Sequence, residues 1–338
     1  MKILITGGCG FVGSNLALKL HKNYEVYCLD SFSKNESKIN EILLKEVKIP
    51  VIKGDISNTE FVNDIVNKLK PDFLFHFAAQ VAMTDSVNDP RYDFETNLLG
   101  TFNLLNAIKY FSVDTKFLNI STNKVYGDLS WDILEELETR YSSINNKKGY
   151  DERTPLSFSG PYGCSKGSAE QYTLDYNRTF SLNTTSLRLS TIYGPNQHST
   201  INQGWIGWFL QQIINNSDKK IIEIPVHGNG KQVRDILYID DFVDLMLSII
   251  KNFDNVNGLV FNVGGSLKNS LSVIEVLNKA LKIYGLKSEI KLIKNNWRPA
   301  DQKYYVSNIE KIEKKLQWFP KTTVDNGLSI FAKWIQNK

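Results

Sequence analysis

Tyr162 and Lys166 lie four residues apart at the start of a helical run, and this pair is the clearest candidate for chemistry in the chain. The spacing places both side chains on one face of a helix. A free tyrosine has a pKa of about 10 and is a poor base at neutral pH, but a neighbouring ammonium stabilises the phenolate and lowers that pKa. The pair could therefore remove a proton from an alcohol, although the same spacing is also common on solvated helix faces.

Thr122 is the second candidate, because it closely follows an apolar run that ends at Ile120. A hydroxyl at the end of a strand can hydrogen-bond the reacting oxygen and hold it against Tyr162. Taken by itself, a threonine in this place is more often a turn former. Its functional interpretation therefore depends on the elements around it.

The first thirty residues contain a dinucleotide fingerprint that would position these groups. An apolar run at 2–6 predicts a buried parallel strand, it leads into a glycine-rich turn at 7–13, and a helical pattern continues from Ser14. Glycines at 7, 10 and 13 permit a tight turn, the approach of backbone N–H groups to a pyrophosphate, and close packing of helix on strand. The pyrophosphate would lie at the positive end of the following helix.

A second apolar run at 26–29 ends at Asp30, at the distance where a carboxylate accepts the ribose hydroxyls of an adenosine. The order of these elements predicts NAD as the cofactor, because Asp30 would repel the 2′-phosphate of NADP. Lys34 lies close enough downstream to keep NADP open as an alternative. With NAD⁺ in place, Tyr162 could take the proton of a sugar hydroxyl while hydride leaves the same carbon.

The cofactor is expected to contact the glycine loop and the loops after the second, third and fourth strands. The predicted contacts are Gly7, Gly10, Phe11, Val12, Gly13, Asp30, Ser31, Asp55, Ile56, Ala78, Gln80 and Asn97, together with Tyr162 and Lys166. Asn97 could equally cap the helix that it opens.

Alternating strand and helix patterns in the first half predict an α/β protein with a Rossmann-type doubly wound parallel sheet. Further strands are expected at 47–53, 73–77, 116–120, 184–189 and 259–263, and helices at 60–69, 98–110 and 235–250. We expect residues 1–189 plus 235–265 to form the NAD-binding domain. Residues 190–234 plus 266–338 would then form a smaller C-terminal substrate-binding lobe.

The composition argues against several classes of protein. The net charge of +4 over 338 residues is spread along the chain, so nucleic-acid binding has no electrostatic support. No apolar run approaches the ~20 residues that span a bilayer, and no signal-peptide pattern is seen, so no membrane role is expected. Three cysteines without a disulfide pattern indicate a reducing cytoplasm, and the four histidines show no metal-ligand spacing, so no metal is expected.

The fingerprint, Asp30, Thr122, Tyr162 and Lys166 together resemble the extended short-chain dehydrogenase/reductase family of nucleotide-sugar enzymes. The resemblance covers essentially the whole chain. It implies a nucleotide-diphosphate sugar as substrate and a homo-oligomer packed through helices.

The resemblance also implies that Arg234 and Arg298 hold the nucleotide diphosphate, for which planar bidentate donors are suited, with surface salt bridges as the alternative. Met83 and Thr84 either border the sugar pocket or pack the core and cap a loop. The predicted substrate contacts are Met83, Thr84, Thr122, Asn123, Arg234 and Arg298.

The residues beside Thr122 discriminate among reactions that begin with removal of a hydride. The related dehydratases carry an Asp–Glu pair directly after this threonine, whereas here Asn123 and Lys124 stand in those positions. Without that pair, elimination of water lacks its proton carriers. Epimerisation needs neither carboxylate.

Several longer segments are similar to the subfamily of CDP-sugar 2-epimerases, namely 80–84, 121–129, 138–141, 149–152 and 203–208, together with an insertion at 129–159. This resemblance implies an isomerase that inverts C2 of CDP-paratose to give CDP-tyvelose through a 2-keto intermediate. A UDP-sugar 4-epimerase, a sugar-nucleotide dehydratase and a non-catalytic NAD-binding protein are the alternatives. The contacts of the insertion do not follow from its composition.

Overall fold

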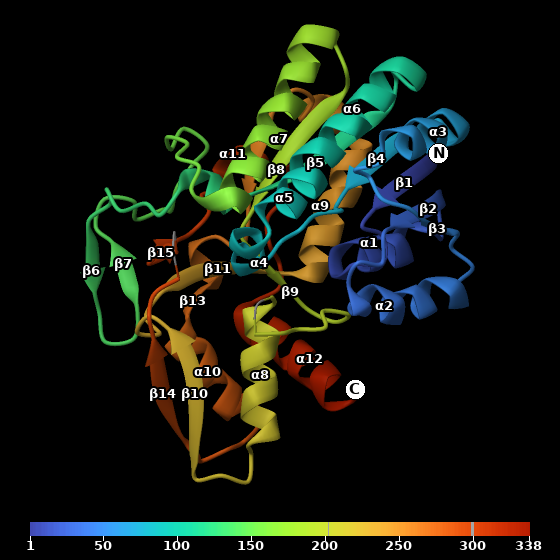
Figure 1. Cartoon of the computed structure of the whole chain (residues 1–338). Coiled ribbons are helices and arrows are strands. Elements are labelled where there is room, and N and C mark those ends of the chain that lie inside the picture. The colour runs from blue at the N-terminus through green and yellow to red at the C-terminus, as the bar shows by residue number, and fades with distance from the viewer. Residues whose placement is uncertain (202, 299–300) are drawn as a thin grey trace.

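The computed structural model describes residues 1–201, 203–298 and 301–338, and a seven-stranded parallel sheet lies at its centre (Figure 1). The strand order is β12-β8-β5-β4-β1-β2-β3, which confirms the predicted doubly wound topology. The strands are β1 (Lys2–Thr6), β2 (Glu25–Asp30), β3 (Val51–Lys53), β4 (Phe73–His76), β5 (Lys116–Thr122), β8 (Thr184–Leu189) and β12 (Val260–Val263).

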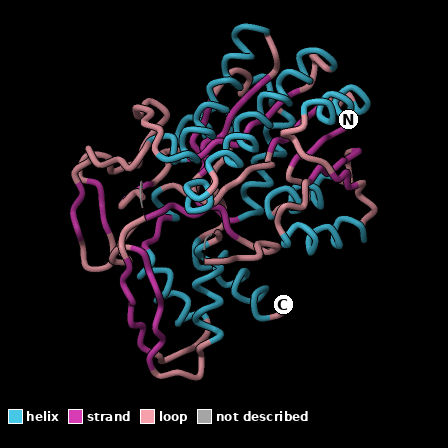
Figure 2. The backbone as a smooth tube through the Cα atoms, in the orientation of Figure 1, coloured by secondary structure: helices cyan, strands magenta, loops and turns pink. Residues whose placement is uncertain are grey.

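Helices cover both faces of this sheet, as the tube in Figure 2 shows. They are α1 (Phe11–Leu20), α2 (Asn35–Glu46) and α9 (Ile239–Lys251) on one face, and α3 (Thr59–Leu69), α6 (Gly100–Phe111) and α7 (Gly160–Phe180) on the other. Side chains alternate along β1, so Ile3 and Ile5 pack in the first layer and Leu4 in the second. Burial on both faces explains why the strands appear as unbroken apolar runs.

A second group of elements lies below this sheet in Figure 1. In it, β11 pairs with β13, β15 and β9, and β10 pairs in parallel with β14. The group consists of β9 (Thr191–Tyr193), α8 (Trp205–Asn215), β10 (Ile221–His227), β11 (Val233–Tyr238), β13 (Ser270–Ser272), α10 (Val273–Ile283), β14 (Glu289–Asn295), β15 (Tyr304–Tyr305) and α12 (Val324–Gln336). α11 (Glu310–Leu316) lies instead at the level of the central sheet in Figure 1 and contacts its edge strand β12. We propose that most of these elements form the substrate-binding lobe.

The other elements are short. They are α4 (Met83–Asn88), α5 (Pro90–Phe94), a π-helical turn (Glu95–Leu99), β6 (Leu134–Glu136), β7 (Tyr141–Ser143) and 3₁₀ turns at Asn123–Tyr126, Phe253–Asn255 and Leu267–Asn269. Within the three described ranges, no helix combines the length and the apolarity needed to cross a membrane.

The predicted helix at 235–250 is wrong over its first four residues. Residues 235–238 belong to β11, and α9 begins only at Ile239. Ile236, Leu237 and Tyr238 pair in parallel with β9 and are buried. A short apolar run of this kind has no periodicity that separates a buried strand from a helix.

Several predicted boundaries also differ from the structure. The strand expected at 47–53 is formed only at Val51–Lys53, because α2 extends to Glu46 and Lys48 adopts a left-handed turn with φ of 59°. The first helix begins at Phe11 rather than at Ser14, so its N-terminus directly follows the glycine turn.

A buried ion pair ties the helix that carries Tyr162 to the sheet. Arg188 on β8 donates from Nη2 to Oε1 of Glu170 on α7 at 2.6 Å, and the two side chains are 4% and 0% exposed. Arg188 Nη1 also donates to the hydroxyl of Tyr126 at 2.8 Å. The network therefore fixes α7, β8 and the turn after β5 relative to one another.

Replacement of Glu170 by Ala is expected to lower the free energy of unfolding by about 3–5 kcal/mol, because it leaves the Arg188 charge buried without its carboxylate. Denaturant unfolding of the two proteins measures this difference. Glu310→Ala is the matched control, since its pair with Lys148 is exposed and contributes at most about 1 kcal/mol. Equal stability of the two variants would contradict a structural role for the buried pair.

Candidate active site

Two cavities lie at the carboxyl ends of the parallel strands, which is where open α/β sheets bind ligands. The larger has a volume of about 450 Å³ and the smaller a volume of about 180 Å³. The residues that line both are Phe11, Val12, Phe77, Ala79, Val81 and Gln203. The cavities therefore adjoin, and an elongated ligand could extend from one into the other.

The glycine turn between β1 and α1 borders the smaller cavity. Gly7 has φ of +66°, and a Cβ there would lie 2.7 Å from the backbone nitrogen of Ala78. A Cβ on Gly13 would collide with the carbonyl oxygen of Gly7. Gly10 is the N-cap of α1, and no side chain caps the first N–H groups of that helix. An open helix N-terminus behind a turn without Cβ atoms fits a pyrophosphate.

Asp30 ends β2 at the edge of the smaller cavity with its carboxylate fixed in place. Oδ1 accepts a hydrogen bond from the N–H of Phe32 at 2.9 Å, and Oδ2 accepts one from the N–H of Cys9 at 3.0 Å. The predicted cofactor residues that line this cavity are Gly7, Gly10, Phe11, Val12, Gly13, Asp30, Ser31, Asp55, Ile56 and Ala78.

Gln80 and Asn97, two further predicted cofactor residues, are joined to each other by hydrogen bonds. Neither is among the described residues that line the two cavities. Asn97 lies inside the π-helical turn, where its Oδ1 accepts from the N–H of Gln80 at 2.9 Å and its Nδ2 donates to the Gln80 carbonyl at 3.0 Å. Nδ2 also donates to Ser165 Oγ at 3.2 Å. The amide thus joins the loop after β4 to α7 and does not cap a helix.

Tyr162, Lys166 and Thr122 come together on the wall of the larger cavity. α7 begins at Gly160, so Tyr162 and Lys166 project from its first two turns. Thr122 is the last residue of β5, and its Oγ1 accepts a hydrogen bond from the N–H of Lys124 at 3.3 Å. A phenol, an ammonium and a hydroxyl that face one cavity can move a proton to or from an alcohol.

In the protein alone, burial has the largest effect on the pKa values of Tyr162 and Lys166. It raises the pKa of Tyr162 to about 12, against a hydrogen bond with Thr122 that lowers it. Burial likewise lowers the pKa of Lys166 to about 8, although Asp93 and Glu170 raise it. Removal from water disfavours both charges, so burial opposes the phenolate in the chain alone. The prediction that the Lys166 ammonium and the positive nicotinamide ring together lower the pKa of Tyr162 stays a prediction.

Asp93 on α5 supports the pair and was not found from the sequence. It is fully buried, and its Oδ2 accepts from Ser165 Oγ at 2.5 Å while its Oδ1 accepts from Asn97 at 3.0 Å. Its charge raises the pKa of Lys166. Nothing in the local sequence marks it, because the contact joins residues 72 positions apart.

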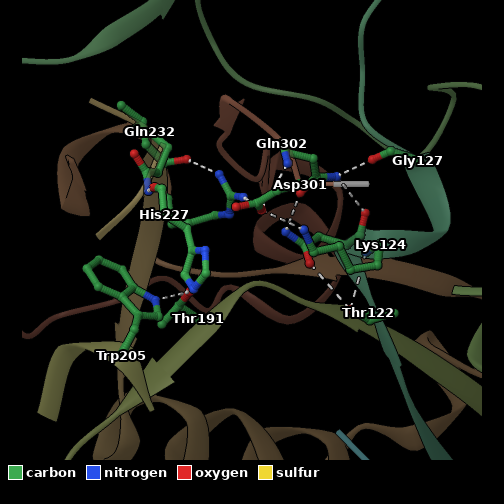
Figure 3. A network of polar contacts seen from close by, with 12 residues as sticks. Thr122, Lys124, Gly127, Thr191, Trp205, His227, Gln232, Asp301 and Gln302 are labelled. Carbon is green, nitrogen blue, oxygen red and sulfur yellow. Dashed lines mark hydrogen bonds and ion pairs between the residues drawn. The ribbon is translucent and has the colours of Figure 1, made fainter. Parts of the chain in front are cut away.

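The far side of the larger cavity brings together segments that are far apart in the sequence (Figure 3). Asp301 Oδ1 accepts from Arg234 Nη2 at 2.7 Å and from Lys124 Nζ at 3.2 Å. Asn123 Nδ2 donates to Gln302 Oε1 at 3.2 Å. Arg298 also lines the cavity, so the two predicted arginines face the same space as Thr122.

The two predicted sugar contacts from α4 differ in position. Met83 lines the larger cavity. Thr84 does not lie among the described lining residues, and its hydroxyl donates to Asp85 at 3.4 Å. Throughout the part of the chain that the structure describes, no cluster of three or more His, Cys, Asp or Glu side chains could hold a metal ion.

Residues 195–201 and Gln203, after β9, contact the first two helices, and Gln203 lines both cavities, which sequence reasoning did not anticipate. Lys34 Nζ, from the edge of the smaller cavity, donates to Gln203 Oε1 at 2.7 Å. Asn40 accepts from His198 at 3.2 Å, and Asn15 donates to the Pro195 carbonyl at 3.1 Å. These bonds join α1 and α2, including the N-cap of α2 at Lys34, to residues after β9, several of which line the larger cavity.

The insertion at 129–159 packs on the sheet of β11, β13 and β15. The N–H of Tyr150 donates to the Val306 carbonyl at 2.8 Å, and Arg140 Nη2 donates to Ser270 Oγ at 2.8 Å. The hairpin of β6 and β7 adds a bond from the Tyr141 N–H to the Lys231 carbonyl at 2.9 Å. The insertion therefore braces the elements that carry Arg234.

Comparisons with known proteins agree with this architecture. A family model described as GDP-mannose 4,6 dehydratase matches residues 4–331. The CDP-paratose 2-epimerase of Salmonella typhi is 41% identical over 336 residues, which cover 99% of this chain and 99% of that protein.

Solved structures with this fold include both epimerases and dehydratases. The UDP-glucuronic acid 4-epimerase of Bacillus cereus, in complex with UDP-glucuronic acid and NAD, has a TM-score of 0.84 and 27% identity, covering 100% of this chain and 99% of that one. The dTDP-glucose 4,6-dehydratase of Bacillus anthracis, in complex with NAD, has a TM-score of 0.80 and 26% identity, covering 100% and 97%. The fold alone therefore does not select between the two reactions.

Proposed function

This chain belongs to the GDP-mannose 4,6 dehydratase family of NAD-dependent epimerases and dehydratases, and we propose that it is an epimerase that inverts C2 of CDP-paratose to give CDP-tyvelose. The choice of nucleotide and sugar is supported by the similarity to the Salmonella typhi enzyme along the whole chain. We further propose that the protein works in the cytoplasm, where its three free cysteines stay reduced, and that it assembles as a homo-oligomer.

The observation that favours an epimerase over a dehydratase is the protonation state of Asp301. Asp301 is the one carboxylate among the described residues that line the larger cavity. Lys124 and Arg234 hold its pKa at about 2, against the effect of burial. Asp301 is therefore a fixed anion and a poor proton carrier at neutral pH. Elimination of water needs an acid and a base beside the sugar, and Asn123 and Lys124 supply no carboxylate there.

The residues of the smaller cavity fit NAD. The tight turn at Gly7, Gly10 and Gly13 leaves no room for Cβ atoms at Gly7 and Gly13, and Asp30 presents a fixed carboxylate for ribose hydroxyls. We propose that Phe11, Val12, Ser31, Asp55, Ile56 and Ala78 complete this site, with Gln80 and Asn97 acting through the loop after β4. When bound, NAD supplies the acceptor for the C2 hydride and the donor that returns it to the other face of the sugar.

The chain itself handles the proton and the position of the sugar. Tyr162 takes the proton of the C2 hydroxyl at its phenol oxygen and gives it back when the alcohol is restored. Thr122 holds the reacting oxygen against Tyr162, and Lys166 supports the phenolate. Arg234 and Arg298 hold the diphosphate, so that the 2-keto sugar can rotate and present its other face without dissociating. Met83 and Asn123 border the sugar.

Substrate trials test this proposal. Purified protein is incubated with CDP-paratose, CDP-tyvelose or UDP-glucose, and the products are resolved by NMR. We expect CDP-paratose and CDP-tyvelose to interconvert with no steady change in nicotinamide absorbance, because the reaction is redox-neutral. Inversion at C4 alone would remove the 2-epimerase assignment and favour the UDP-sugar 4-epimerase.

Loss of the bond between Lys34 and Gln203 is expected to speed NAD release. This bond ties the start of α2 to Gln203, which lines both cavities. Lys34→Met should raise the NAD dissociation rate about tenfold, the worth of one charge-assisted hydrogen bond. Dilution of NAD-loaded protein followed by separation of free NAD measures the rate. Lys38→Met, on the exposed side of α2, is the control. Equal retention in both variants would show that the bond does not hold the cofactor.

A further inference from the structure

Lys124 is a buried cation on the wall of the larger cavity that the proposed reaction does not use. Its side chain is 13% exposed, and its backbone N–H donates to Thr122 Oγ1 at 3.3 Å. Figure 3 shows Lys124 next to Thr122, with its ammonium turned toward Asp301. A buried ammonium costs desolvation energy, so it needs negative charge nearby.

The protein supplies too little negative charge around this lysine. Lys124, Arg234 and Arg298 gather around Asp301, which is the one carboxylate that the described residues place on this cavity wall. Burial, together with the charges of both arginines, lowers the pKa of Lys124 to about 8, while Asp301 alone opposes them. Arg298 Nε is also buried without a hydrogen-bond partner among the described residues. The three cations therefore carry more positive charge than Asp301 can neutralise.

A phosphate bound by this cluster would lie close to the catalytic hydroxyl. Lys124 is on the same 3₁₀ turn that Thr122 caps, whereas Arg234 comes from β11 and Arg298 from the loop after β14. A ligand phosphate that contacts all three cations would lie on the same cavity wall as Thr122, with Lys124 as the cation nearest to Thr122 in the chain. Lysine binds phosphate as a point charge, without the fixed geometry of arginine.

In a nucleotide sugar, the position of the β-phosphate determines which sugar carbon can reach Tyr162. The β-phosphate is attached through oxygen to C1, C2 is bonded directly to C1, and C4 lies across the ring. A β-phosphate next to Thr122 therefore brings C2 to Tyr162. For C4 to reach Tyr162, the ring would have to separate the phosphate from the catalytic groups.

Building on the function proposed above, we infer that Lys124 binds the β-phosphate of the nucleotide sugar and thereby places C2, rather than C4, opposite Tyr162. Asp301 acts as a positioning residue, because its Oδ1 holds both Lys124 Nζ and Arg234 Nη2. The cation at this place also attracts the anionic substrate into the cavity.

The test compares CDP with CMP, which differ only in the β-phosphate, by calorimetric titration of the NAD-loaded protein. Lys124→Met should weaken CDP binding at least about tenfold, as expected for loss of a charge-assisted contact, and leave CMP binding nearly unchanged. Lys124→Arg should retain most of the CDP affinity. Lys231→Met is the control, because Lys231 pairs with Glu136 at 3.0 Å and does not line the cavity. Equal weakening of CDP and CMP, or no weakening of either, would overturn the contact.

Turnover tests the choice of carbon separately. At saturating CDP-paratose, kcat for C2 inversion should fall at least about tenfold in Lys124→Met, since the reacting carbon loses its position, and should recover in Lys124→Arg. An unchanged kcat beside weakened CDP binding would refute the positioning role. If the wild-type protein does not convert CDP-paratose but Lys124→Met still weakens only CDP, the proposed function fails while the phosphate contact stands. If the wild-type protein binds neither cytidine nucleotide, the same comparison with UDP and UMP decides the contact.

Discussion

Tyr162→Phe is expected to lower the rate of epimerisation by about 10²- to 10⁴-fold, the usual contribution of a positioned general base. The phenyl ring keeps the packing of α7 against the cavity wall, so only the proton acceptor is lost. Thr122 and Lys166 keep their places, and the substrate should bind with nearly unchanged affinity. The rate is measured by NMR on CDP-paratose, and the absence of transient NADH absorbance locates the defect in the oxidation step.

Tyr172→Phe is the matched control for this variant. Tyr172 lies on the same helix with a side chain that is 44% exposed and outside both cavities, so its hydroxyl has no part in the proposed chemistry. The control should retain wild-type activity. A Tyr162→Phe protein that matched it would assign the proton to another group.

The pH dependence of the oxidation step is the second large effect. We expect Tyr162 and Lys166, which lie on one face of α7, to share their protons as a pair that loses its first proton near pH 8, since burial brings the pKa of Lys166 to about 8 and that of Tyr162 to about 12. The reactive form has one proton fewer, with phenolate beside ammonium. The rate should therefore rise about tenfold per pH unit below the first pKa of the pair and level off above it.

Lys166→Met moves this profile to higher pH, because the first proton must then leave Tyr162 itself. At pH 7.5 the oxidation rate should fall by about a hundredfold or more, with partial recovery as the pH is raised. Single-turnover absorbance of NADH measures the rate across the profile. Lys311→Met is the control, because burial lowers the pKa of Lys311 as well but the residue lies outside both cavities. A profile for Lys166→Met with the wild-type midpoint would contradict the paired titration.

The sheet and the cofactor half of the site could be predicted from the sequence, because their signals are local. The strand at 2–6, the glycines at 7–13 and Asp30 lie within thirty residues, and each has a steric or electrostatic reason to be there. Tyr162 and Lys166 share a helix face through spacing alone. The apolar runs of the buried parallel strands needed no tertiary information.

The substrate half could not be predicted in the same way, because contacts between distant segments build it. Lys124 meets Asp301 across 177 positions, and Asn123 meets Gln302 across 179. No periodicity brings such pairs together before the chain folds. The high pKa of Tyr162 is also a property of burial. The predicted helix at 235–250 wrongly includes 235–238, because the apolar run there has no period that separates a strand from a helix.

The central claim is that C2 loses a hydride and receives the same hydride back on its other face. CDP-paratose carrying deuterium at C2 tests it directly when incubated with the protein in ordinary water. We predict CDP-tyvelose with its deuterium fully retained at C2 by NMR and mass spectrometry. Product with solvent hydrogen at C2 would contradict the account, because it would mean that a proton rather than a hydride is removed from that carbon.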